Sequence, residues 1–239
     1  MRELKAQFCA RRGELFLILG VEAGFFIPSE ILVAVIMHTD GSGNAVFQIG
    51  TLAAVIAAAF VIGTMGISVL PLHFNLAVSM RTARKRFIPA FLLVSCLENL
   101  TAAGAAYLLS LLETRIMQTV YSGMSREFVS EYIFQWKYIL AACLGLVALN
   151  MFMGMLFMKY GQIAWAGFWV LWVIGTVGAP KIYKLMKQVQ GTVLGEIFRS
   201  VSDFTGGFTE NGILAAAVIV SLSLLAVSWI VLRRQEVKM

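Results

Sequence analysis

Three glutamates inside otherwise apolar stretches are the first candidates for chemistry in this sequence. They are Glu22, Glu30 and Glu98, and Asn99 follows the last of them. An ionisable group at the centre of a bilayer costs at least about 2.5–3.5 kcal/mol, so the three glutamates could line a pathway or a subunit seam. On one helix Glu22 and Glu30 would lie about 80° apart, which predicts that both avoid lipid. A role as protonated or hydrogen-bonded packing elements remains open as the alternative.

Other chemical patterns are missing. The cysteines Cys9, Cys96 and Cys143 are far apart and show no paired spacing, so we expect neither a disulfide framework nor a metal site. His38 and His73 are expected near opposite membrane faces, which disfavours a shared metal site. Motifs of nucleotide-binding loops, zinc proteases and serine hydrolases are absent from the sequence. We therefore expect no cofactor and no metal in this chain.

The composition is that of a membrane protein. The 239 residues are 59% hydrophobic and 13% charged, with a mean hydropathy of +0.83, whereas soluble domains carry roughly 25% charged residues. No Asp, Glu, Lys or Arg occurs between Asp40 and Arg81. The apolar runs are continuous and do not alternate, so membrane-spanning helices are expected and a β-barrel is not.

The expected fold is all-α, a single polytopic transmembrane domain over residues 1–239. Residues 1–14 read as a short interfacial helix on the cytosolic side. Pro28 interrupts the first span, and Pro71 marks the end of the second. Six transmembrane helices are expected at about 15–38, 47–70, 89–112, 138–158, 163–183 and 212–232.

The basic residues set the expected orientation. Twelve of the 19 Lys and Arg residues fall in the N-terminus, the loop before span three, Lys159 and the C-terminal tail. Because Lys and Arg are retained in the cytosol, both termini are predicted to be cytosolic and the chain to be a multi-pass protein of the plasma membrane. The net charge of +6 is thereby explained without nucleic acid as a partner.

The two long polar segments, 113–137 and 184–211, are predicted to lie outside the cell. Apolar residues recur every four positions in both, which indicates amphipathic extracytoplasmic helices. The repeating residues are Val120, Met124, Phe128, Tyr132 and Trp136 in the first segment, and Leu185, Val189, Val193, Ile197 and Val201 in the second. For segment 184–211, re-entry into the membrane stays open as an alternative.

The loop over residues 71–87 combines ordered apolar residues with a basic cluster. Positive-inside topology alone explains the charges but not the pattern that precedes them. That pattern, with the six-span layout, resembles the loop helix of small bacterial ABC exporter permeases of the type-2 (type V fold) class. The matching positions are Phe74, Ala77, Ser79, Arg84, Lys85 and Phe87. Met80 stands where the class often has glycine.

The resemblance implies the transmembrane permease subunit of an ATP-driven exporter of an apolar or amphipathic cargo, such as a peptide, a lipid-like molecule or an antimicrobial compound. Its partners would be a separate ABC ATPase, which holds ATP and Mg, and a second permease copy or homologue. The alternative is a polytopic membrane enzyme or a stand-alone immunity-type protein. The implied ATPase-coupling residues are Phe74, Leu76, Ala77, Ser79, Arg81, Arg84, Lys85, Arg86 and Phe87.

The expected topology can be tested by cysteine-accessibility labelling in intact cells. A cysteine introduced by Ser125→Cys or Ser202→Cys should react with a membrane-impermeant thiol reagent, because both segments are placed outside. A cysteine introduced by Ser79→Cys should not react, because its loop is placed in the cytosol. Labelling at position 79 from outside would overturn the six-span arrangement.

Overall fold

The computed structural model describes residues 2–40, 45–79, 84–120, 125–128, 130–173 and 209–234. Within these ranges the chain is helical apart from one pair of three-residue strands. The helices are α1 (Arg2–Asp40), α2 (Ile49–Ser79), α3 (Arg84–Val120), α4 (Ser130–Ile133), α5 (Trp136–Tyr160), α6 (Gln162–Val173) and α9 (Glu210–Arg234).

Five of these helices, α1, α2, α3, α5 and α9, are long and apolar enough to cross a membrane. Their sequences are rich in Ala and Leu, which favour helices, and contain long runs without charge. α1, α2 and α3 have 39, 31 and 37 residues, whereas about 20 suffice to span the hydrocarbon core. These three helices must therefore tilt or project beyond it.

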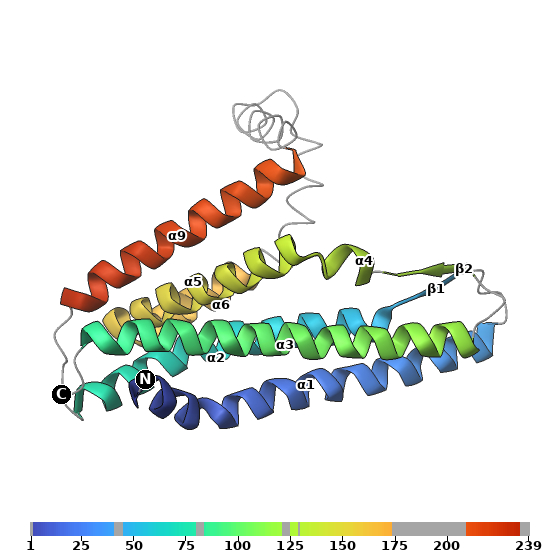
Figure 1. Cartoon of the computed structure of the whole chain (residues 1–239), viewed down its shortest axis with the longest axis horizontal. Helices are drawn as coiled ribbons and strands as arrows, with labels where there is room; N and C mark the ends of the chain where they lie inside the picture. Colours follow the sequence, from blue (N-terminus) through green and yellow to red (C-terminus); the bar gives the residue numbers. More distant parts are fainter. Residues whose placement is uncertain are drawn as a thin grey trace.

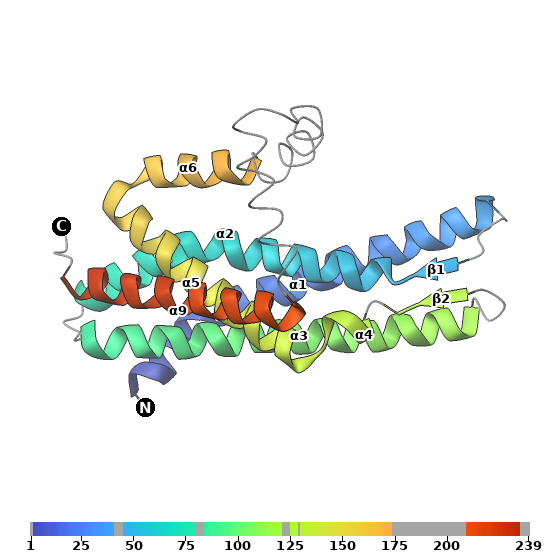
Figure 2. The ribbon, with the colours of Figure 1, turned by 90° about the horizontal axis from the view of Figure 1, so that it is seen from above.

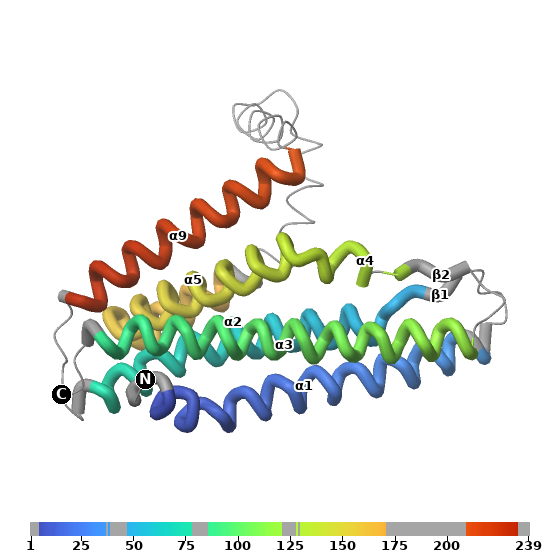
Figure 3. The backbone as a smooth tube through the Cα atoms, in the orientation of Figure 1, coloured from blue at the N-terminus to red at the C-terminus, as the bar shows by residue number. Residues whose placement is uncertain are grey.

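The bundle is elongated, with α1 and α3 running along its length, whereas α5 and α9 begin near its middle (Figure 1). At one end, here called the loop end, α1 begins, α2 ends, α3 begins, α5 turns into α6, and α9 ends. At the strand end, the two short strands pair. The view from above shows the same order of ends, with α6 on one side of α2 and α9 near α5 (Figure 2). Figure 3 traces the backbone through both ends.

The strands are β1 (Ala45–Phe47), which follows α1, and β2 (Ser125–Glu127), which follows α3. They pair in parallel, with Val46 opposite Arg126. The parallel direction follows from the helices, because α1 and α3 both run from the loop end to the strand end (Figure 1). The pair therefore ties the far ends of two helices together.

α2 is the centre of the bundle and contacts α1, α3 and α5, while α9 packs on α5. Small residues allow α2 and α5 to approach closely. A side chain at Gly66 would collide with Asn150 of α5, and a Cβ on Gly154 would lie 2.8 Å from the Cβ of Leu70. Asn150 also donates a hydrogen bond of 3.1 Å to the carbonyl of Ile62. The α2–α5 interface is thus fixed by both shape and polarity.

The turn between α5 and α6 is tight. α5 ends at Tyr160, and α6 begins at Gln162. Gly161 between them has φ +62°, a conformation in which side chains with a Cβ are rarely found, and its N–H donates to the carbonyl of Phe157 at 2.7 Å. The sharp reversal therefore depends on glycine.

Large apolar side chains cover the outside of the helices. Phe16 is 65% exposed, Leu108 66% and Ile219 63%. Such broad apolar surfaces are unusual for a monomer in water and match the hydrocarbon of a bilayer. Length, composition and surface together indicate a membrane protein.

Two expected boundaries near the loop end are wrong. Residues 1–14 do not form a separate helix, because α1 continues without a break from Arg2 to Asp40. Pro71 does not end the second span, since α2 runs on to Ser79 and α3 begins at Arg84, before Pro89. A proline inside a membrane helix is tolerated where neighbouring groups satisfy the freed carbonyl.

The expectation of one amphipathic helix across 113–137 is also wrong. α3 extends to Val120, and the segment then contains β2 and the short α4. Strand pairing between Ser125–Glu127 and β1 overrides the four-residue apolar period. The expected span 163–183 is described as α6 only to Val173, so a sixth span is not established. Most of segment 184–211, up to residue 208, lies outside the described residues.

The loop-end core contains residues that the sequence placed on a docking surface. Phe74 is fully buried, and Ala77 and Phe87 are nearly so. The rings of Phe74 and Phe87 meet edge-on with centroids 5.7 Å apart. These residues belong to a core cluster that also includes Val69, Leu70, Ile88, Phe91, Met151, Met155 and Leu232.

Phe74, Ala77 and Phe87 were expected to contact a partner, but burial in this core leaves them no exposed surface for that contact. Their side chains hold α2, α3 and α5 together. Leu76 and Arg86 are exposed, as expected of docking residues. The side chains of Ser79, Arg81, Arg84 and Lys85 lie outside the described residues.

Truncation of Phe74 should act on stability first. Phe74→Ala leaves a cavity in the loop-end core and should cost about 3–5 kcal/mol in free energy of unfolding. Leu72→Ala, on the same helix but 67% exposed, is the matched control and should cost less than about 1 kcal/mol. Thermal unfolding of both variants in detergent measures the difference. Equal stability of the two variants would contradict the packing described above.

Candidate functional site

Buried polar residues gather at three places along the bundle: the loop end, the strand end and a pocket between them. The sequence-predicted residues are divided among all three. Glu98 lies at the loop end, Glu30 at the strand end, and Glu22 and Asn99 line the pocket. The expected pathway or seam is thus not one continuous constellation.

The loop-end cluster consists of Arg11, Glu14, His73, Ser95 and Glu98. Arg11 is its centre, with nitrogen–oxygen distances of 2.5 Å to Glu98, 2.9 Å to Glu14 and 2.7 Å to Ser95. His73 of α2 lies 3.3 Å from Glu14. The cluster therefore joins α1, α2 and α3 through paired charges.

These charged side chains are buried, so their pairing stabilises the arrangement of the helices. Arg11 is 6% exposed and Glu98 4%, and the Arg11 guanidinium also lies 4.6 Å from the centre of the Phe91 ring. A buried charge is retained only when it is paired and hydrogen-bonded. The burial of Glu98 is therefore explained by its ion pair with Arg11. The sequence analysis had placed Arg11 on an interfacial helix.

The strand-end cluster consists of Glu30, Gln48, Thr51 and Glu113. Glu113 of α3 accepts hydrogen bonds from the backbone N–H groups of Gly50 and Thr51, at 2.9 and 2.7 Å, and from the Thr51 hydroxyl at 2.5 Å. These N–H groups belong to the first turn of α2, which has no acidic residue of its own there. Glu113 therefore caps α2 from a neighbouring helix.

Gln48 extends the strand-end cluster to α4. Its side-chain N–H donates to the Thr114 hydroxyl at 2.9 Å, and its carbonyl oxygen accepts from the Ser130 backbone N–H at 2.9 Å. Glu30 of α1 reaches the same region, next to Gly50 and the Glu113 carboxyl. Glu22 is 1% exposed, and Glu30 is partly buried against α2, so both side chains face the bundle.

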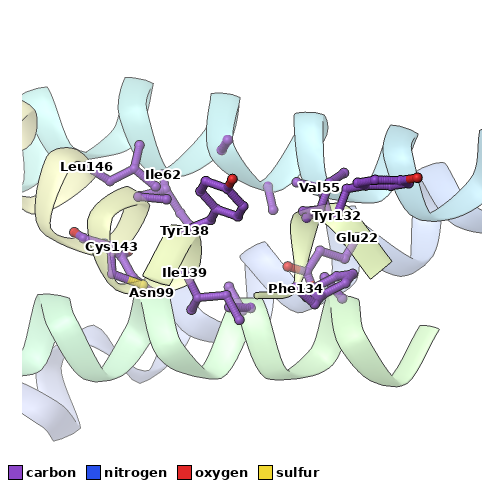
Figure 4. Close-up of a pocket in the computed structure, with 17 residues that line it drawn as sticks. Glu22, Val55, Ile62, Asn99, Tyr132, Phe134, Tyr138, Ile139, Cys143 and Leu146 are labelled. Carbon is purple, nitrogen blue, oxygen red and sulfur yellow. The ribbon is translucent and has the colours of Figure 1, made fainter. Parts of the chain in front are cut away.

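Between the clusters lies the central pocket, a partly open cavity of about 490 Å³. It is enclosed by α2, α3, α4 and the first half of α5, with Glu22 of α1 reaching in. Figure 4 shows Glu22 at the same end as Tyr132 and Phe134, and Asn99, Cys143 and Leu146 at the other. The remaining lining is apolar: Val55, Ala58, Ala59, Ile62, Ala102, Ala103, Ala106, Ile133, Ile139 and Ala142, with the Tyr138 ring.

The polar side chain of Asn99 has one hydrogen-bond partner within the pocket. Its amide donates to the carbonyl of Cys143 at 3.3 Å, linking α3 to α5. Glu22 differs, because neither of its oxygens has a hydrogen-bond partner among the described residues. The pocket can accommodate an apolar body, and the buried Glu22 side chain lies at its wall.

Sequence reasoning missed Arg11, Gln48 and Glu113 as functional or architectural residues. Arg11 and Glu14 stand three apart, a spacing that permits an ion pair on a helix. Nothing in the sequence indicates that Arg11 also pairs with Glu98. The signal for Glu113 was indirect: the start of α2 lacks an acidic residue in its first turn. Among the described residues no group of three or more His, Cys, Asp or Glu could hold a metal.

Comparison with family models, with curated proteins and with solved structures finds no match.

The Arg11–Glu98 pair should show strong coupling in unfolding experiments. Glu98→Gln leaves Arg11 buried with a weaker partner and should destabilise the chain by about 3 kcal/mol. Combining it with Arg11→Gln should cost less than the sum of the single changes, by about 1–3 kcal/mol, because the second change removes the orphaned charge. Additive single and double effects in thermal unfolding would show that the two side chains do not interact.

Proposed function

We propose that this chain is the transmembrane permease subunit of an ATP-driven ABC exporter with an apolar or amphipathic cargo. The central pocket is the observation that supports this function best. It lies inside a bundle of membrane-spanning helices, is lined mainly by Ala, Ile and aromatic side chains, and presents few polar groups. Such a lining suits a cargo that partitions between lipid and protein.

The arrangement of the ends supports a transporter fed from the cytosol. Basic residues at the start of α3 (Arg84, Lys85 and Arg86) and at the end of α9 (Arg233 and Arg234) gather at the loop end (Figure 1). Under the positive-inside rule this end faces the cytosol, and the strand end faces outward. The pocket then lies between the two faces, closed toward the cytosol by the loop-end core.

An ATPase subunit would dock at the cytosolic end of α2. Leu72 and Leu76 are 67% and 51% exposed and lie one helical turn apart. They replace Phe74 as proposed anchors. Phe74, on the inner side of the same turns, contacts Phe87 of α3 and belongs to a cluster with Met151 of α5. A force on Leu72 and Leu76 would thus be transmitted to α3 and α5.

ATP and Mg are assigned to the ATPase subunit, and this chain supplies no nucleotide site. A second permease copy or a homologue completes the exporter in this proposal. The apolar outer faces of α1 and α9 are compatible with such pairing in the bilayer.

The proposed function can be tested by purifying the tagged chain from its native membrane in a mild detergent. An ABC ATPase should copurify and hydrolyse ATP in the complex. Leu72→Ala with Leu76→Ala should reduce the amount of retained ATPase about tenfold or more, because anchor residues carry most of the energy of an interface.

Leu108→Ala with Leu112→Ala is the matched control. These leucines have the same spacing and similar exposure, 66% and 52%, but lie on α3 toward the strand end. The control should retain the ATPase. Absence of any ABC ATPase from the wild-type preparation would refute the exporter assignment, and equal losses in both double variants would refute the docking site.

A further inference from the structure

The carboxyl group of Glu22 is buried in the central pocket without a partner. The residue is 1% exposed, and neither carboxyl oxygen receives a hydrogen bond from the described residues. A buried carboxyl group without hydrogen bonds is costly. Its position at the pocket wall therefore calls for an explanation beyond packing.

The other buried carboxyl groups show what a packing role looks like in this chain. Glu113 receives three hydrogen bonds at the start of α2, and Glu98 is paired with Arg11. Glu22 has no equivalent neighbour, although it lies on the same helix as Arg11. Packing alone thus accounts for Glu98 and Glu113 but not for Glu22.

The described pocket lining offers Glu22 no positive charge. Arg11 is held in the loop-end cluster, and Lys137 pairs with Glu210 at 2.5 Å. The lining is otherwise apolar or aromatic, with Asn99 donating its amide to the Cys143 carbonyl. The missing complement to Glu22 is a hydrogen-bond donor that carries positive charge.

A protonated amine supplies this complement. An ammonium group is a compact charge with three donors and forms short charge-assisted hydrogen bonds with a carboxylate. A pocket of about 490 Å³ is within the range of small-molecule sites, roughly 300–1,000 Å³, so it can also accommodate an apolar body. A divalent cation is a poorer fit, because it requires about six oxygen ligands and Glu22 is the only carboxylate among the described residues that line the pocket.

We propose that the central pocket binds an amphipathic amine, with Glu22 pairing with the ammonium group and the apolar lining holding the hydrocarbon or aromatic body. The description of this ligand as cargo rests on the exporter function proposed above. The binding itself does not, and it can be measured without an ATPase.

The test uses the full chain in nanodiscs of phosphatidylcholine and a pair of fluorescent probes. The first is a dansyl group joined by a five-carbon chain to a primary amine, and the second is its neutral N-acetyl derivative. Dansyl emission rises in apolar surroundings and reports binding. Wild-type protein should bind the amine about tenfold or more tightly than the acetylated probe, the factor expected for a charge-assisted hydrogen bond.

Two carboxyl variants separate recognition from general attraction of cations. Glu22→Gln should weaken amine binding about tenfold or more, leave the acetylated probe unchanged, and preserve the thermal unfolding temperature. Glu131→Gln removes an exposed carboxyl group beside the pocket-lining Tyr132 and should leave both affinities unchanged. A third variant, Ala59→Leu, fills the pocket and should weaken both probes.

Several results would overturn the inference. One is wild-type protein that binds neither probe or binds both equally well. Others are a Glu22→Gln variant that keeps the amine affinity or loses both probes together, and an Ala59→Leu variant that binds both probes normally. Amine binding at Glu22 without a copurifying ATPase would support this site and reject the exporter function. A copurifying ATPase together with no preference for the amine probe would support the exporter function and reject the amine site.

Discussion

The cost of exposing charge to hydrocarbon governs this structure. A charged group facing lipid is penalised by several kcal/mol, so the ionisable residues of α1, α2 and α3 meet inside the bundle. The clearest case is Arg11, which contacts Glu14, Ser95 and Glu98. Because its partners lie on different helices, satisfying one guanidinium sets how α1 and α3 are placed. The strand-end cluster does the same at the opposite end, through Glu113 and the first turn of α2.

The two clusters leave the middle of the bundle free of strong polar contacts. There the helices are held by small residues, as at Gly66 and Gly154 between α2 and α5, and by single amide bonds from Asn99 and Asn150. The pocket lies in this weaker region, between two well-fixed ends. An architecture of this kind can change the width of its centre while its ends keep their partners.

Composition and hydropathy were sufficient to predict the helical membrane architecture, because continuous apolar runs leave few alternatives in lipid. They also placed Glu22 and Glu30 away from lipid. Boundaries were less predictable. Pro71 is an ordinary signal for a helix end, but tertiary contacts of His73 and Phe74 carry α2 past it. The pairing of β1 with β2 joins segments far apart in the sequence, which no local pattern reports.

The candidate site was also only partly predictable from the sequence. Their residue types and positions in apolar stretches identified Glu22, Glu98 and Asn99 as candidates, but only the structure shows which of them have partners. Glu98 has a counter-charge contributed by residue 11, whereas Glu22 has none among the described residues. The residues predicted to couple to an ATPase illustrate the opposite error. An apolar residue in a short connection has the same sequence signature whether it faces a partner, as proposed for Leu76, or the core, as Phe74 does.

The Arg11 contacts also bear on how the chain is made. Ser95, a partner of Arg11, is 84 residues further along. At synthesis rates of about 5–20 residues per second, Arg11 emerges from the ribosome about 4–17 s before Ser95. During that interval its side chain lacks its α3 ligands and is kept near the headgroups by its hydration. α1 can settle to its final depth only after α3 has entered the bilayer, so α1 is fixed in place well after its own synthesis.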